Sequence, residues 1–203
     1  AERIISIPIG TDLSLFTHAE GGERKRQILF AQRLIHEKCP MLFCSVVKEV
    51  CDEFPEVTIE IAGDGFLKEE MESFFEKNNM TDKVVFHGMV DQQKLVELYN
   101  TSHCYLHTAD WEGWGMPMIE AMAAGCPVVT TDTGCAGEAV RHNETGLVTA
   151  VNDKDALVRE TKRLFADQNF WDEMAKNSRD EAKIWAFDTL AKNNMQWYER
   201  CGK

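Results

Sequence analysis

Short apolar runs alternate with longer helical patterns along this chain, and this alternation restricts the possible folds more than any other feature. The expected strands are Gln27–Ala31, Val57–Ala62, Val84–Phe86, Cys104–His107, Pro127–Thr130 and Gly146–Val148. The expected helices are about Pro40–Glu53, Phe66–Asn78, Gln92–Asn100, Pro117–Ala124 and Gly137–Arg141, and Asp91 and Asp153 are expected N-caps. From Asp153 onward the pattern is wholly helical. The sequence therefore predicts one α/β domain with a doubly wound parallel sheet and a helical C-terminal extension.

The length, charge and cysteine content limit the classes of protein to which the chain can belong. A chain of 203 residues suits one domain with a sizeable core, about 1–150, followed by the extension at about 151–203. The net charge of −12 argues against nucleic-acid binding but permits nucleotide binding. No apolar run approaches the ~18 residues of a membrane helix, and no signal peptide opens the sequence. The seven cysteines include no C-x-x-C pair, so we expect a cytoplasmic protein without disulfides or a metal cluster.

Polar and glycine-rich segments follow several of the expected strands. In a doubly wound sheet, ligands bind beyond the carboxyl ends of the strands. We therefore expect one crevice, lined by Gly10-Thr11, Arg33–Lys38, Gly63–Gly65, Gly88–Val90 and Asp110–Gly115.

Two acids, Glu112 and Glu120, flank a glycine-rich turn that leads into an expected helix. Glu120 lies among apolar neighbours, where burying a carboxylate costs free energy unless it accepts hydrogen bonds. Hydroxyl groups of a ligand are suitable donors for such bonds. Gly113 and Gly115 allow the backbone to approach a ligand closely, and Pro117 favours the first helical turn. The free N–H groups and the positive dipole end of this helix form a natural anion site.

The order of residues in this block resembles a known family motif. The block is Glu112-Gly113-Trp114-Gly115-Met116-Pro117, then Glu120-Ala121-Met122-Ala123, Gly125 and Pro127-Val128-Val129. It resembles the E-x7-E motif of retaining GT-B glycosyltransferases of family 4, also called glycosyl transferases group 1. Similar stretches extend over nearly the whole chain: Ile7–Asp12, Ile28–Lys38, Ile61–Gly65, Val84–Val90, Gly134–Val140 and Glu144–Leu147. The resemblance implies the Rossmann-like C-terminal domain of a GT-B enzyme.

The resemblance also implies roles for individual residues. Arg33 and Lys38 would bind the donor diphosphate, Glu120 would accept hydrogen bonds from the ribose, and Glu112 would lie near the sugar and the reacting centre. Glu112, Arg33 and Lys38 are therefore the implied catalytic residues. The other implied donor-binding residues are Gly10, Gly63, Gly65, Met89, Val90, Gly113, Trp114, Gly115 and Met116, with Met89 and Val90 at the base.

Many of these residues also have a purely structural interpretation. Arg33 and Lys38 would then belong to a solvated basic loop, and Glu120 would stabilise a helix end through the dipole. Gly63 and Gly65 would form an ordinary strand-to-helix turn. The sequence alone does not decide between these structural roles and the donor-binding roles.

Other positions depart from the family pattern or are explained by packing. Trp114 replaces the usual phenylalanine, and packing is its favoured explanation. For Met89 and Val90, apolar packing and contact with the base are equally favoured. Gln32 and Cys39 replace the glycines that usually flank the Arg and Lys, so they put the phosphate assignment in question.

The histidines and cysteines suggest structural roles. His103 and His107 share an expected strand and form no metal-binding pattern, so we interpret them as structural and assign no metal. Cys44 and Cys51 lie among apolar residues and are expected in the core. Glu138 is interpreted as a helix N-terminal residue.

The resemblance implies transfer of a hexose from a UDP- or GDP-sugar to a hydroxyl of a glycan, lipid or small molecule. It also implies retention of anomeric configuration without an obligatory metal or other cofactor. Because the resemblance covers only the donor-binding domain, and the chain opens on Ala1, we expect a fragment that lacks its N-terminal acceptor domain and has little activity alone. The full-length protein is expected in the cytoplasm, with peripheral membrane association open to it.

Several alternative functions remain open from the sequence. The chain can be part of another GT-B enzyme, such as a nucleotide-sugar epimerase or a phosphorylase, or the donor-binding subunit of a two-chain transferase. It can also be a non-catalytic nucleotide-binding or interaction module. A glycosidase also uses two carboxylates, but an acid in a helix behind a phosphate-type loop favours a nucleotide sugar.

Overall fold

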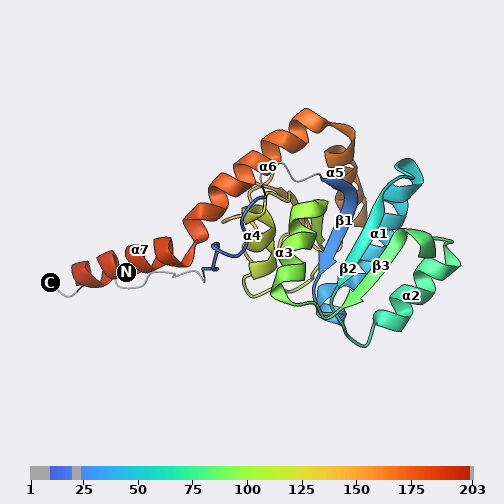
Figure 1. Cartoon of the computed structure of the whole chain (residues 1–203), viewed down its shortest axis with the longest axis horizontal. Coiled ribbons are helices and arrows are strands. Elements are labelled where there is room, and N and C mark those ends of the chain that lie inside the picture. The colour runs from blue at the N-terminus through green and yellow to red at the C-terminus, as the bar shows by residue number, and fades with distance from the viewer. Residues whose placement is uncertain (1–9, 20–23, 202–203) are drawn as a thin grey trace.

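The computed structural model describes residues 10–19 and 24–201, and its centre is one parallel β-sheet (Figure 1). The strands are β1 (Lys25–Ala31), β2 (Thr58–Ala62), β3 (Val84–Gly88), β4 (Ser102–His107), β5 (Val128–Thr131) and β6 (Leu147–Thr149). Their order is β3-β2-β1-β4-β5-β6, and every neighbouring pair is parallel. The chain order reverses between β1 and β4. This confirms the predicted doubly wound topology, and a ligand crevice is expected at that reversal.

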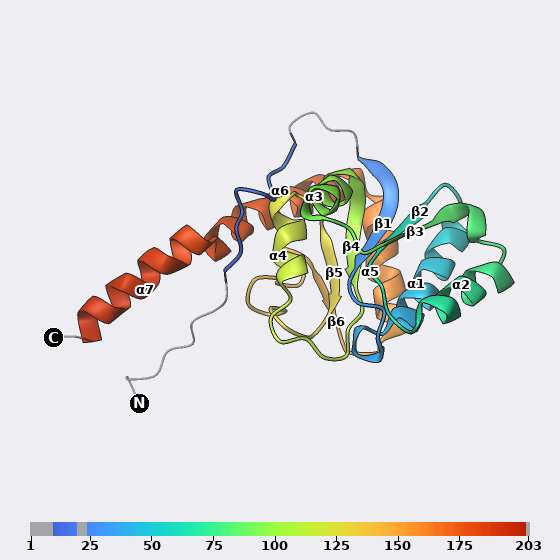
Figure 2. The same cartoon turned by 60° about the horizontal axis from the view of Figure 1, so that its bottom comes forward.

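Helices cover both faces of the sheet (Figure 2). The α-helices are α1 (Pro40–Glu53), α2 (Lys68–Lys77), α3 (Gln92–Thr101), α4 (Met116–Ala123), α5 (Lys154–Ala166), α6 (Gln168–Ala182) and α7 (Phe187–Cys201). Short 3₁₀ turns are η1 (His36–Lys38), η2 (Thr81–Lys83) and η3 (Lys183–Trp185). Helices α1, α2 and α5 cover one face and α3 and α4 cover the other, while α6 reaches both core clusters.

The side chains of β1 show how the sequence builds two cores. Ile28 and Phe30 point into the core under α1 and α5, whereas Leu29 and Ala31 point into the core under α3 and α4. This is the alternation that a strand requires. Because both faces are covered, the strand is a continuous apolar run rather than a half-polar one.

Local signals at the element ends are confirmed. Asp91 caps α3 by accepting a hydrogen bond from the N–H of Lys94 at 2.8 Å, and Asp153 caps α5 through the N–H of Ala156 at 3.0 Å. Asp167 caps α6 in the same way, and the sequence interpretation missed it. Cys44 and Cys51 are buried in the core as expected.

The helix expected over Gly137–Arg141 is wrong. The segment forms turns between short bridges, and Gly137 adopts a φ of 81°. Thr145 stabilises this arrangement, since its Oγ1 accepts from the N–H of Arg141 at 2.8 Å and donates to the carbonyl of Ala139 at 2.6 Å. Side-chain hydrogen bonds to the backbone compete with a short helix in this way. Glu138 is therefore not a helix N-terminal residue.

The C-terminal extension is helical as predicted, and its last helix leaves the body of the domain. Figures 1 and 2 both show α7 projecting away from the sheet layers. Residues Gly10 and Thr11 pack at the start of α7, where Thr11 pairs with Trp185 and Phe187 through backbone hydrogen bonds of 3.1 and 3.0 Å. The motif positions Ile7–Ile9 lie outside the described residues. In the part of the chain that the structure describes, no helix has the length and apolarity that crossing a bilayer requires.

Candidate functional site

Hydrogen bonds connect the loops that follow the strands at the carboxyl edge of the sheet. The N–H of Gln32 donates to the carbonyl of Ala62 at 3.0 Å, and the N–H of Gly63 donates to the carbonyl of Gly88 at 2.8 Å. These bonds tie the loops after β1, β2 and β3 together. Across the reversal between β1 and β4, Thr108 Oγ1 donates to the carbonyl of Lys38 at 3.0 Å. The expected site segments from β1 to β4 therefore meet at this edge.

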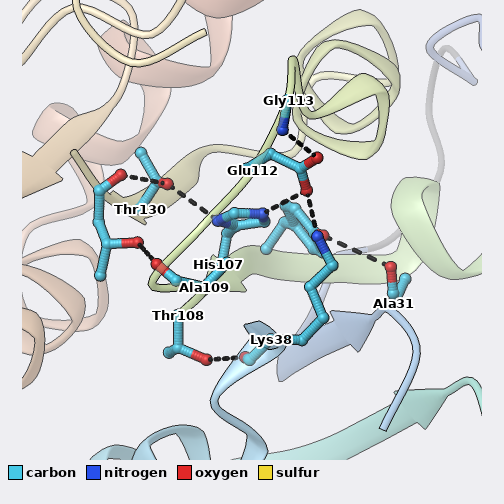
Figure 3. Close-up of polar contacts among 10 residues, drawn as sticks. Ala31, Lys38, His107, Thr108, Ala109, Glu112, Gly113 and Thr130 are labelled. Atoms are coloured by element: carbon cyan, nitrogen blue, oxygen red, sulfur yellow. Dashed lines mark hydrogen bonds and ion pairs between the residues drawn. The ribbon is translucent and has the colours of Figure 1, made fainter. Parts of the chain in front are cut away.

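Lys38 and Glu112 form an ion pair across the reversal (Figure 3). Lys38 Nζ lies 2.7 Å from Glu112 Oε2, and the two side chains are only 10% and 17% exposed. A pair with so little solvent keeps much of its electrostatic interaction, and removal of either partner leaves an uncompensated charge. Two of the three residues implied to be catalytic are thus brought together by different strands.

His107 joins this pair from the buried side. It is the last residue of β4, and its fully buried ring places Nε2 3.4 Å from Glu112 Oε2 and Nδ1 3.2 Å from Thr130 Oγ1. Burial lowers the pKa of His107, so the ring is neutral near pH 7. The sequence interpretation treated His107 as structural only. Its position at the carboxyl end of a strand, five residues before Glu112, was the available signal.

Glu112 is an ionised acceptor near neutral pH. The contact with His107 and the ion pair with Lys38 outweigh burial and lower the pKa of Glu112 to about 2. Its Oε1 also accepts the N–H of Gly113 at 3.0 Å. A carboxylate with this pKa accepts hydrogen bonds and does not act as a general acid near neutral pH.

Glu120 has a different environment from Glu112. It is half-buried on α4, and burial raises its pKa. Tyr99 on α3 donates a hydrogen bond to Glu120 Oε2 at 3.3 Å, and no cation pairs with Glu120 within the described residues. The ring of Tyr105 lies 5.8 Å from that of Tyr99 and 6.2 Å from that of His107. A row of buried rings therefore underlies both acids, and the sequence interpretation missed it.

A small pocket lies at the ends of β1, β2 and β3. Its volume is about 190 Å³, and its lining comes from Ala31, Gln32, Arg33, Ala62, Gly63, Met89, Val90 and Leu95. Arg33 is exposed and makes no side-chain hydrogen bond or ion pair among the described residues. Gln32 is 9% exposed, and neither its Nε2 nor its Oε1 has a hydrogen-bond partner there. The loop thus supplies one free cation and one unsatisfied amide to the pocket.

The turn before α4 is open toward solvent at Gly113 and tightly packed at Gly115. A Cβ on Gly113 would contact nothing within 4 Å, whereas one on Gly115 would lie 2.2 Å from Met118 Cε. No side chain caps α4 at Gly115. Pro117 has no N–H and the N–H of Met118 donates to the carbonyl of Gly115 at 2.9 Å, so the N–H of Met116 is the one left at the positive end of the helix. Trp114 packs against Trp185 with ring centroids 5.2 Å apart, in agreement with the packing interpretation.

The glycines implied to bind the donor differ in their surroundings. A Cβ on Gly63 would lie 1.9 Å from the carbonyl oxygen of Gln32, and one on Gly65 would lie 2.4 Å from that of Leu34. Both glycines therefore permit the loops after β1 and β2 to touch. Gly10 instead packs against the start of α7, and none of its close contacts is with another expected site residue.

The described residues contain no group of three His, Cys, Asp or Glu side chains arranged to hold a metal ion. The positive charges at the crevice come from Lys38 and Arg33 and from the N-terminus of α4.

Similar proteins are known at both the sequence and the structural level. A putative glycosyltransferase of Bacillus subtilis is 29% identical over 188 residues, which is 88% of this chain and 46% of that protein. A 2-deoxystreptamine N-acetyl-D-glucosaminyltransferase of Niallia circulans is 27% identical over 77% of this chain and 40% of that protein. The chain thus spans about half the length of these relatives.

Solved structures share the fold. The C-terminal domain of a glycosyl transferase group 1 family protein (LpcC) from Francisella tularensis matches with a TM-score of 0.78 and 20% identity, over 86% of this chain and 97% of that one. Anabaena Alr3699/HepE, solved with UDP and glucose, matches with a TM-score of 0.82 and 20% identity, over 94% of this chain and 55% of that one. The family profile "Glycosyl transferases group 1" matches residues 17–181. The chain therefore belongs to the glycosyl transferases group 1 family and has the fold of a GT-B C-terminal domain.

Proposed function

We propose that this chain is the donor-binding half of a retaining glycosyltransferase that transfers a hexose from a nucleoside diphosphate sugar to an acceptor hydroxyl. The main supporting observation is the Lys38–Glu112 pair at the reversal between β1 and β4. It places a cation for phosphate and an ionised acceptor for sugar hydroxyls side by side. The family membership and the UDP in the Anabaena protein are consistent with this chemistry.

The diphosphate would lie between Lys38, Arg33 and the uncapped N-terminus of α4. Lys38 supplies a point charge, and Arg33 supplies a fork of donors that is free of internal partners. The N-terminus of α4 adds the backbone N–H of Met116 and a positive dipole end. These groups stabilise the negative charge that develops on the leaving diphosphate, so the proposal requires no metal ion or other cofactor.

The two acids would bind the two ends of the donor. Glu112 accepts hydrogen bonds from the sugar, since its low pKa keeps it ionised. Glu120 accepts hydrogen bonds from the ribose, and these would offset the cost of burying its charge. The base, uracil or guanine, would occupy the pocket beside Met89 and Val90.

The acceptor and the remaining reactive residues would come from an N-terminal GT-B domain. The chain spans about half the length of its relatives, which favours a donor-binding half over a complete enzyme. The acceptor would be a glycan, a lipid or a small molecule. A donor-binding subunit of a two-chain transferase has the same site and differs only in how the second domain is supplied. Turnover by the 203-residue chain alone would contradict the incomplete-site proposal.

The donor site is tested by ligand binding. UDP-glucose, UDP-N-acetylglucosamine, GDP-mannose, UDP and GDP are screened by thermal shift in buffer with EDTA, because a ligand that binds only the folded state raises its stability. Calorimetry then compares the wild type with Glu120→Ala and with Glu72→Ala on the exposed face of α2 as a matched control. We expect Glu120→Ala to weaken nucleotide binding about tenfold or more. Equal affinity in all three proteins would reject the ribose role of Glu120.

A further inference from the structure

Glu112 is held from its buried side by an imidazole that the proposed function does not use. The His107 ring contacts Glu112 through Nε2 at 3.4 Å and Thr130 through Nδ1 at 3.2 Å. Thr130 is also fully buried, and it lies directly opposite His107 in the register of β4 against β5. Figure 3 shows polar contacts running from Thr130 through His107 to Glu112, which also contacts Lys38. The sheet therefore fixes the imidazole, while Glu112 lies on a loop.

The two contacts of the ring require a particular tautomer. A neutral imidazole has one N–H, so it can donate to only one of its two partners. The ionised carboxylate of Glu112 can only accept, so the hydrogen must lie on Nε2, and Nδ1 must accept from the hydroxyl of Thr130. The opposite tautomer would turn a lone pair of Nε2 toward the carboxylate. Thr130 Oγ1 also lies 2.9 Å from the carbonyl oxygen of Thr131, and a hydroxyl turned that way would leave Nδ1 without a donor.

Lys38 is shared between Glu112 and the diphosphate in the proposed function. In the proposed function the diphosphate competes with Glu112 for the N–H groups of Lys38. Among the described residues, the polar contacts of the His107 ring are those with Glu112 and Thr130, so a bound diphosphate leaves them in place. His107 can therefore keep the carboxylate oriented when Lys38 turns to the phosphates.

We infer that His107 and Thr130 are positioning residues for Glu112. Thr130 fixes the Nε2–H tautomer of His107, and His107 holds the carboxylate where it accepts hydrogen bonds from hydroxyls of the donor sugar. This inference rests on the proposed function. The titratable groups that face the imidazole are Glu112, Lys38 after β1, and Tyr105 on the same strand.

The tautomer is tested without any ligand. Nitrogen-15 NMR of histidine-labelled protein at pH 7 distinguishes the Nε2–H, Nδ1–H and charged forms, and His107→Gln assigns the signal. We expect the neutral Nε2–H form in the wild type and in Thr130→Ser, which keeps the hydroxyl. Thr130→Val has a similar shape but no hydroxyl, and we expect it to lose this uniform tautomer. An Nδ1–H or charged ring in the wild type would overturn the inference.

The positioning role is tested by comparing ligands with and without sugar. Calorimetry uses UDP-glucose against UDP, and GDP-mannose against GDP. In His107→Leu and Thr130→Val, we expect affinity for the sugar-bearing ligand to fall about tenfold while affinity for the nucleoside diphosphate is unchanged. His107→Gln, whose amide N–H can reach Glu112, and Thr130→Ser should retain most of the sugar-dependent affinity.

The possible failures of this test are distinguishable. Equal losses for both ligands, or no loss in His107→Leu, would overturn the positioning role and leave the proposed function intact. If the wild type binds none of the four ligands, the proposed function fails, while the NMR result still decides the tautomer. Thermal unfolding of each variant identifies any that do not fold. The comparison of Thr130→Ser with Thr130→Val is the most informative, because these two substitutions change the side-chain volume least.

Discussion

At the scale of single residues, the two acids of the E-x7-E block differ because of what surrounds them. Glu112 meets an ammonium group, an imidazole and a backbone N–H, and its pKa falls to about 2. Glu120 meets one tyrosine hydroxyl and apolar surroundings, and burial raises its pKa. The same motif thus holds one acid whose charge the protein stabilises and one whose charge it leaves largely uncompensated.

The environment of Glu112 predicts a specific pH dependence of stability. Its folded pKa of about 2 lies below the ordinary value of 4.5, so its contribution is fully present above about pH 5 and is lost as pH falls from about 5 to about 2. Glu112→Gln leaves the buried Lys38 without its partner and should be less stable at pH 7. The difference in unfolding free energy between wild type and Glu112→Gln, measured in urea, should shrink on acidification. A difference that stays constant from pH 7 to pH 3 would contradict this prediction.

Gln32 predicts a stabilising substitution at the edge of the pocket. Its carboxamide is buried without partners, and such groups cost about 1–3 kcal/mol each. Gln32→Leu should therefore raise the unfolding free energy by about 1–3 kcal/mol in urea denaturation. Gln27→Leu is the matched control, because Gln27 Nε2 donates to Thr101 and Ser102 at 3.2 and 3.1 Å, and its loss should destabilise. Destabilisation by both substitutions would show that Gln32 has a partner in solution.

At the scale of elements, the contact between the loops after β1 and β2 decides the shape of the site. Gly63 has a φ of 146°, and an added Cβ would lie 1.9 Å from the carbonyl oxygen of Gln32. Gly63→Ala should therefore destabilise the protein by about 3 kcal/mol and displace the loop that bears Arg33. Gly113→Ala meets open space and should leave stability nearly unchanged. Urea denaturation measures the free energy of unfolding of both variants. If the two values are similar, the loops after β1 and β2 can move apart at little cost in free energy, which would contradict this prediction.

The strands and most helices could be predicted because their signals are local. A strand covered on both faces is a continuous apolar run, and Asp91 and Asp153 mark helix starts by their own hydrogen bonds. The Gly137–Arg141 prediction failed because side-chain bonds from Thr145 competed with the short helix.

The partners of the site residues could not be predicted in the same way. The contact of His107 with Thr130 depends on the register of β4 against β5, and the contact of Lys38 with Glu112 depends on which strands are neighbours. Contacts between residues far apart in the chain produce no periodic pattern in the sequence. The family resemblance named Lys38 and Glu112, but not their contact or the histidine behind it.

At the scale of the whole molecule, the helices of the sheet domain are packed on one another and on the sheet, whereas most of α7 is not packed against any other described part of the chain. The two cores are filled from strands and helices of the body, up to Leu190 near the start of α7. Beyond it, Met195 and Tyr198 are exposed large hydrophobic side chains on a helix that projects from the body (Figure 2). Within the described residues, this end of α7 therefore lacks the tertiary packing that the helices of the body have.

This arrangement predicts where limited proteolysis will cut. A helix without tertiary packing is marginal in water and opens readily, so trypsin should cut first at Lys192, in α7, while the described body from 24 to 185 stays intact. Mass spectrometry of the fragments identifies the cut, and thermal unfolding of the trimmed product should match that of the whole chain. Early cleavage within the body, for example after Lys77 in α2, with α7 resistant, would show that α7 is already packed in the isolated chain.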